Sequence, residues 1–114
     1  KRGYSNRSEA IRDLIRDLLV HQEWKSNDVV AGVITILYEH HHRDLVPKLL
    51  RLQHQYQTLI SSSLHIHQDE HNCLEVITVR GNARHIQQFA NLLKATKGVK
   101  HAVLTAASLG KKIK

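Results

Sequence analysis

Residues 62–80 read SSLHIHQDEHNCLEVITVR, and the expected fold is built around them. Apolar and polar residues alternate over 62–68 and again over 72–80, which is typical of β-strands. The polar residues between the two segments predict a turn. The stretch is therefore expected to form a β-hairpin.

The flanking segments extend this hairpin into a sheet with helices. A β-branched run at 29–38 predicts a strand that is covered on both faces. Amphipathic helices are expected at 43–60 and 83–96, and a last strand at 99–105. This order of elements is that of the ferredoxin-like βαββαβ fold, an α+β fold whose helices cover one face of an antiparallel sheet. The open face is then expected to pack on another subunit.

A short basic unit precedes this domain. We expect residues 1–24 to form one unit and residues 28–114 the second, joined by a linker at Trp24–Asp28. Residues 9–20 have the period of a helix, with Ser8 as its N-cap. Its apolar stripe needs a partner, either another subunit or sequence outside this chain; the stripe consists of Ala10, Ile11, Leu14, Ile15, Leu18 and Leu19.

The composition narrows the classes of function. The 114 residues include 17 Lys and Arg against 10 Asp and Glu, and the net charge of +7 favours a polyanionic partner. A single cysteine excludes an internal disulfide and indicates a reducing compartment, so a cytoplasmic location is expected. No apolar run is long enough for a membrane helix, and the start lacks a signal peptide. The absence of methionine indicates that the sequence is part of a longer chain.

Ten histidines make metal binding the leading question. With the hairpin turn centred near Glu70, His67 faces Cys73 and His65 faces Glu75, with Cβ atoms roughly 5 Å apart across the strands. Two imidazoles and a thiolate suit Zn, Cu, Co or Ni.

A closed site needs a fourth ligand, for which the hairpin geometry leaves His54, His71 and Glu75 open. The opposite face of the hairpin is expected to pack on the helices, which would place the ligands at the subunit contact; that face carries Leu64, Ile66, Leu74 and Val76. The remaining histidines are expected to be surface residues, and a solvated loop is favoured over a secondary metal site for His40, His41 and His42.

Three motifs resemble a known family. Residues 3–13, GYSNRSEAIRD, resemble the second helix of ribbon-helix-helix DNA-binding domains. The stretches HIH at 65–67 and HNCLE at 71–75 resemble the regulatory domain of the NikR family of nickel-responsive repressors. This resemblance implies a repressor of nickel-uptake genes that binds operator DNA. It also implies an ACT-like regulatory domain at the core of a homotetramer, a dimer of dimers.

The resemblance also implies a ligand set. His65, His67 and Cys73 match three nickel ligands of one subunit, and His54 matches the fourth, which a neighbouring subunit supplies. Three imidazole nitrogens and one thiolate sulfur in a plane favour Ni(II), because Zn(II) prefers a tetrahedron. Tyr38 and Glu75 match residues that support the ligands.

In the N-terminal unit the resemblance implies contacts with DNA phosphates from Asn6, Arg7, Ser8 and Arg12, at a helix start whose free N–H groups suit an anion. Glu9 and Asp13 match a second cation site, although an exposed acidic pair is an equal interpretation. The family reads bases with an N-terminal strand. That strand and the first helix are not in this sequence, so the chain by itself is not expected to read an operator.

The expected mechanism is a nickel cross-link between subunits that orders the regulatory core and sets the spacing of the DNA-binding units. The residues by themselves leave two other classes of function open. One is a zinc hydrolase with two His and one Cys as ligands and Glu75 as base. The other is an ACT-like module that binds a small molecule. The resemblance favours the regulator, which is not an enzyme.

Overall fold

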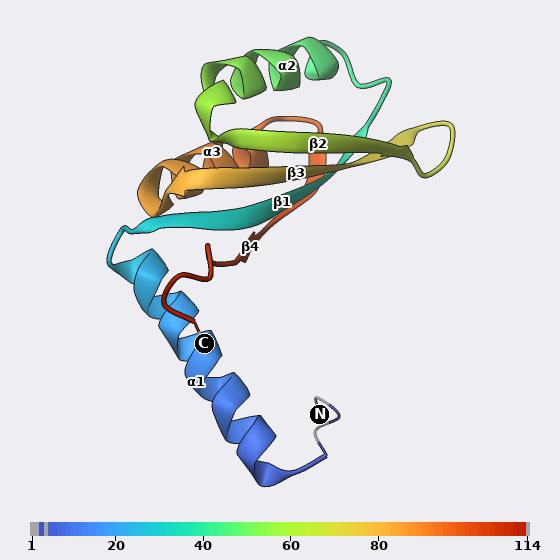
Figure 1. Ribbon diagram of the computed structural model, residues 1–114. Helices are drawn as coiled ribbons and strands as arrows, with labels where there is room; N and C mark the ends of the chain where they lie inside the picture. The colour runs from blue at the N-terminus through green and yellow to red at the C-terminus, as the bar shows by residue number, and fades with distance from the viewer. Residues whose placement is uncertain (1–2, 4, 114) are drawn as a thin grey trace.

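The computed structural model describes residue 3 and residues 5–113. From the N-terminus its elements are α1 (Arg7–Lys25), β1 (Val29–Glu39), α2 (Leu45–Gln55), a 3₁₀ turn η1 (Gln57–Leu59), β2 (Ile60–His67), β3 (Asn72–Asn82), α3 (Ala83–Ala95) and β4 (Val99–Ala106). The strands form one antiparallel sheet in the order β2-β3-β1-β4 (Figure 1). From β1 onward the order is βαββαβ, so the predicted α+β, ferredoxin-like fold is confirmed.

One face of the sheet holds the core. Alternate residues of β1 and β3 are buried, which is the period expected of strands with one covered face. They pack on the apolar sides of α2 and α3, where Tyr56 stacks on Phe89 with ring centroids 4.9 Å apart. The core side chains that are fully buried and largest are Tyr38, Phe89, Ile34, Ile36, Leu45, Ile77, Ile86 and Leu93.

The assignment of the hairpin's two faces was wrong. We expected Leu64, Ile66, Leu74 and Val76 to pack on the helices, but Leu64 is 59% exposed and Ile66 38% exposed. The other face turns inward instead, and it carries Cys73 and Glu75 as well as apolar residues. The reason lies further along β3, where Ile77 and Val79 have the same parity as Cys73 and are buried under the helices.

The 43–60 segment is a shorter α-helix than expected. It begins at Leu45, with Pro47 in its first turn, and ends at Gln55. The backbone N–H of Tyr56 then bonds Leu52 O, and the chain tightens into η1 before entering β2. Because α2 ends at Gln55, it does not cover β2, and the histidines of β2 are exposed to solvent.

α1 differs from the expected helix at both ends. Its N-cap is Asn6 rather than Ser8, because the Asn6 side chain accepts the Glu9 N–H at 2.9 Å. The helix runs to Lys25, so Trp24 belongs to it and not to a linker. The division into two domains near this point stays a prediction.

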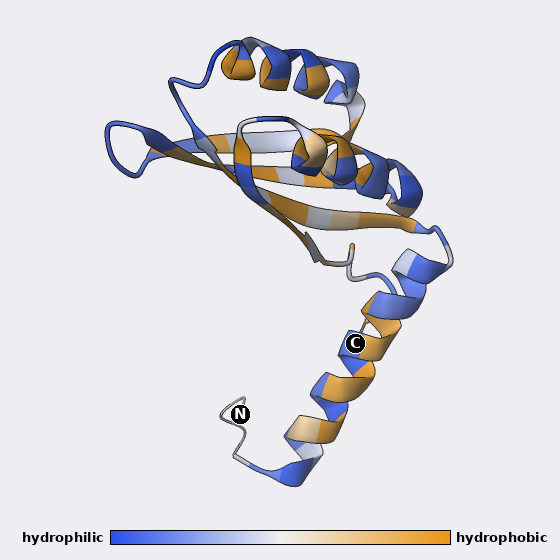
Figure 2. Ribbon diagram, turned by 180° about the vertical axis from the view of Figure 1, so that it is seen from behind, coloured by the Kyte–Doolittle hydropathy of each residue, from blue (hydrophilic) through white to orange (hydrophobic). Residues whose placement is uncertain are grey.

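α1 extends away from the sheet (Figure 1). Its apolar stripe forms an orange band along the helix (Figure 2), and Ile11, Leu14, Ile15 and Leu18 are each at least half exposed. Such a stripe has no cover within the described part of one chain, which agrees with the expectation that it needs a partner.

Candidate metal centre

The hairpin places the predicted ligands in the predicted register. His67 pairs with Cys73 and His65 pairs with Glu75 across β2 and β3. β2 is an edge strand, so both histidines are exposed, whereas Cys73 is 2% and Glu75 1% exposed. The hairpin therefore combines two accessible imidazoles with a buried thiol and a buried carboxyl group.

A hydrogen-bonded turn fixes the hairpin. Asp69 Oδ1 accepts the backbone N–H groups of His71 and Asn72, both at 2.8 Å. These bonds, that from His71 first, lower the pKa of Asp69 to about 2. The turn is therefore held by a carboxylate that stays ionised at any pH near neutrality, and it sets the strand register on which the site depends.

The thiol of Cys73 lies between two imidazoles. Its Sγ is 3.5 Å from His67 Nδ1 and 3.9 Å from His40 Nδ1, and the rings of His40 and His67 are 5.6 Å apart. The contact with His40 was missed by the sequence reasoning, which placed this residue in a solvated loop. The position of His40 follows from the end of β1. Tyr38 pairs with Cys73, so the residues that directly follow β1 lie near the thiol.

His65 takes part in a different group of contacts. Tyr38 Oη lies 3.3 Å from His65 Nδ1, and Glu75 Oε2 lies 3.1 Å from His65 Nε2. Burial, followed by the charges of Glu75 and Cys73, raises the pKa of Tyr38 to about 12. The hydroxyl therefore keeps its proton at neutral pH and can donate it to His65 Nδ1, and in that tautomer Nε2 donates to Glu75 Oε2.

Glu75 connects this group to α2. Gln53 Nε2 donates to Glu75 Oε2 at 3.0 Å, so the last turns of α2 are tied to the hairpin. The other oxygen, Oε1, is buried and has no hydrogen-bond partner among the described residues. A buried carboxylate with one unpaired oxygen is costly, so this position favours a nearby cation or proton donor.

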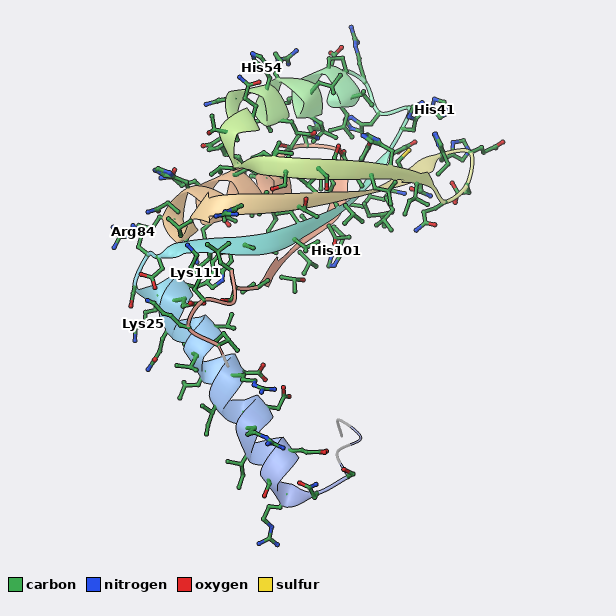
Figure 3. All side chains as sticks on the ribbon, in the orientation of Figure 1. Lys25, His41, His54, Arg84, His101 and Lys111 are labelled. Atoms are coloured by element: carbon green, nitrogen blue, oxygen red, sulfur yellow. The ribbon has the colours of Figure 1, made fainter. Side chains whose placement is uncertain are left out.

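His54 follows Gln53 but does not reach the hairpin. Its side chain is exposed, and Figure 3 shows it on α2, away from β2 and β3. Within residue 3 and residues 5–113, no three His, Cys, Asp or Glu side chains converge closely enough to hold a metal ion. One chain therefore brings His67 and Cys73 together, joins His65 to Tyr38 and Glu75, and leaves His54 apart.

His41 and His71 lie at the outer end of the hairpin. His41 Nε2 is 3.0 Å from Glu70 O, and the two imidazole rings are 5.8 Å apart. His71 Nε2 lies 3.2 Å from Glu70 Oε1. All of these groups are exposed, which fits the expected solvated loop for His41. His71, one of the candidates for the fourth ligand, is directed toward Glu70 rather than toward Cys73.

The residues of α1 singled out for DNA and cation binding lie at its exposed start. Asn6 caps the helix, as described above, and Glu9 Oε2 accepts the Ser5 hydroxyl at 2.9 Å. The two acidic side chains, Glu9 and Asp13, are partly exposed. The side chains of Arg7, Ser8 and Arg12 are exposed and can meet a large polyanion.

Imidazoles beside one thiol are a donor set typical of proteins that bind transition metals. Residues 31–107 match the family described as the NikR C terminal nickel binding domain. The chain therefore belongs to the NikR family of nickel-responsive regulators, and Ni(II) is the metal of that domain. This match favours a regulator over the zinc hydrolase that the residues alone left open.

The relatives agree with this family. The chain is 55% identical over 112 residues to a protein of Pyrococcus abyssi and 56% identical over 112 residues to one of Pyrococcus horikoshii. Each alignment covers 97% of this chain and 81% of the relative, and both relatives are named putative nickel-responsive regulator.

A solved structure supports the fold. The uncharacterized protein TM1266 from Thermotoga maritima superposes with a TM-score of 0.63 at 14% sequence identity. The match covers 69% of this chain and 98% of that one. In the described part of the chain, no helix is long and apolar enough to cross a membrane.

Proposed function

We propose that the chain is a DNA-binding repressor of nickel-uptake genes that responds to Ni(II) bound by His65, His67 and Cys73 of one subunit and His54 of another. The observation that carries this proposal is the buried Cys73 thiol beside His67, with His54 exposed on the far side of its own α2. A ligand that faces away from its own hairpin is suited to the hairpin of a second copy. The proposal implies a homotetramer, a dimer of dimers, in the cytoplasm.

The chemistry of these side chains fits Ni(II). A soft thiolate with imidazole nitrogens is a donor set that this metal accepts in a plane. When bound, the metal would supply a cross-link between two subunits. The unpaired Glu75 Oε1 adds negative charge close to this donor set, which favours a cation.

Nickel binding must change one contact of His65, because both of its nitrogens have partners. Release of Nδ1 breaks a bond to a neutral phenol at 3.3 Å, whereas release of Nε2 breaks a shorter bond to a carboxylate. We infer that Nδ1 is the ligand atom. Glu75 then continues to orient the ring through Nε2, as carboxylates commonly do for metal-binding histidines.

Tyr38→Phe tests this arrangement. The variant lacks the hydroxyl that must release Nδ1 before nickel can bind there, so we expect nickel affinity to rise by about 2- to 10-fold, the net contribution of one hydrogen bond. Competition titration against a chelator of known affinity measures it. The matched control is Tyr56→Phe, because Tyr56 is partly buried against the core, where it stacks on Phe89. Equal nickel affinities for the wild type and Tyr38→Phe would remove Tyr38 from the site.

The second half of the proposal concerns α1. We propose that its exposed apolar stripe packs on the equivalent helix of another subunit, as in a ribbon-helix-helix dimer. The start of the helix would then face DNA, where Asn6, Arg7, Ser8 and Arg12 contact phosphates. Glu9 and Asp13 would form a second cation site close to the same end.

Two measurements test the proposed function. Nickel titration should produce a thiolate-to-nickel charge-transfer band that saturates at about one metal per subunit, as four ligands from two subunits require. Binding of duplex DNA should depend on salt, and Arg7→Gln with Arg12→Gln should lower the slope of log K against log salt by about 0.9 for each phosphate that the variant no longer neutralises. A band that never appears, or DNA affinity that ignores nickel, would contradict the proposal.

A further inference from the structure

We infer that residues 107–113, which follow β4, act as a strap that fixes the direction in which α1 leaves the sheet. This segment turns back toward α1 (Figure 1). Lys112 shares a surface hollow with Ile15 and Leu19 of α1, and it contacts Asp28 in the hinge, residues 26–28, that joins α1 to β1. The inference concerns contacts far from the metal centre, and none of them enters the proposed nickel site.

The first contact pins the end of α1. Trp24 Nε1 donates to Ala107 O at 2.8 Å, and Ala107 N donates to Ala31 O of β1 at 2.9 Å. The indole packs over Gly32, where a Cβ atom would lie 3.2 Å from two ring carbons and from Thr105 O. The last turn of α1 is therefore held between the start of the sheet and the strap.

The second contact is an ion pair across the hinge. Lys112 Nζ lies 2.9 Å from Asp28 Oδ2. This hydrogen bond first, then the charge of Asp28 and a smaller contribution from Glu23, raise the pKa of Lys112. Glu23 is buried, and its Oε1 has no hydrogen-bond partner in the part of the chain that the structure describes. The lysine thus lies in the field of two carboxylates, one at each side of the hinge.

The strap has a defined shape. Gly110 has φ +84°, a backbone conformation that glycine adopts without strain. Its N–H donates to Ser108 Oγ at 2.9 Å, and Ile113 N donates to Gly110 O at 3.3 Å. These bonds close a compact turn that presents Lys112 to Asp28.

The hinge is held from its other side by α3. Asn27 has φ 61°, and its Oδ1 accepts the Arg84 N–H at 2.9 Å, while Asp28 O accepts the Ala83 N–H at 3.0 Å. Residues 26–28 are thus bracketed by the start of α3 and by the strap. If α1 carries the DNA contacts, a consequence that rests on the proposed function, the strap limits the positions that the DNA-binding units can take.

Amide hydrogen exchange of the full chain, without nickel or DNA, tests the strap. In Lys112→Gln we expect the amides of residues 26–28 to exchange about two- to fivefold faster, the range of an exposed ion pair. Asp28→Asn should have the same effect, and the double variant should add little to either change. Lys111→Gln, which removes the adjacent positive charge, is the matched control and should exchange like the wild type. Raising the salt concentration should reduce the difference between the wild type and Lys112→Gln.

A distance measurement tests the consequence for α1. In a Cys73→Ser background, nitroxide labels at Ser8→Cys and Lys97→Cys report the distance between the start of α1 and the sheet domain. The distance distribution should broaden when Lys112→Gln is added and stay unchanged with Lys111→Gln. If exchange rates and distances are the same in all of these variants, residues 107–113 do not fix the direction of α1, and the inference is wrong. Because neither experiment contains nickel or DNA, failure of the proposed function leaves their outcome unaffected.

Discussion

Cys73→Ala is expected to lower the nickel affinity of the protein by more than about 100-fold, since even the partners that orient ligands typically contribute about 10- to 100-fold. The thiol is the only sulfur ligand that the chain can offer. Its loss leaves imidazoles alone, which no longer distinguish Ni(II) from other divalent ions of the same series. The charge-transfer band of the thiolate should disappear completely, and with it the nickel dependence of DNA binding.

The controls separate ligation from folding. Cys73 is buried, so its removal affects packing as well as chemistry, and thermal unfolding of the metal-free chain measures that part. Cys73→Ser keeps the shape of the side chain but not the soft ligand, and should lose the band like the alanine variant. His101→Ala removes an exposed histidine of β4 and should bind nickel within about twofold of the wild type (Figure 3). Unaltered nickel affinity and nickel-dependent DNA binding in Cys73→Ala would sink the proposed mechanism.

The strand register could be predicted from the sequence because it depends on local patterns. A polar turn between two alternating segments allows few pairings, and the pairing of His67 with Cys73 followed directly. The faces of the hairpin were harder, because both parities of β3 contain apolar residues. Which face turns toward the helices is set by Ile77 and Val79. Their burial depends on α3, an element that is distant from the site.

The candidate site could be predicted only in part. The three proposed ligands of the hairpin are close in sequence, and their spacing suggested a metal. His40 is different, because its approach to Cys73 depends on where β1 ends relative to β3, a long-range register that no local pattern shows. The role of Trp24 was missed for a similar reason. It follows an amphipathic helix and looks like the start of a linker, yet it is buried against Gly32 of the next element.

His54→Ala is expected to weaken nickel binding by about 100-fold, through the loss of a ligand that another subunit supplies. His54 is exposed on α2, so the variant should keep the fold and the thermal stability of the metal-free chain. The adjacent Gln53 contacts Glu75 of its own chain, whereas His54 lies away from its own hairpin, so under the proposed function α2 offers His54 to a neighbouring subunit. The loss of affinity by itself does not show whether His54 binds the metal of its own chain or that of another subunit. A mixture of two variants distinguishes the two arrangements.

Hybrid oligomers of His54→Ala and Cys73→Ala chains provide that distinction. Neither variant alone can form a complete site. When the two chains are unfolded together and refolded at equal amounts, a complete site forms wherever His54 of a Cys73→Ala chain meets the intact hairpin of a His54→Ala chain. Random assembly about a symmetric interface gives about one complete site in four. The charge-transfer band of the wild type should therefore return to about a quarter of its strength at a nickel concentration that leaves each separate variant empty. If all four ligands came from one chain, no mixture could contain a complete site, and the band would stay at the level of the separate variants.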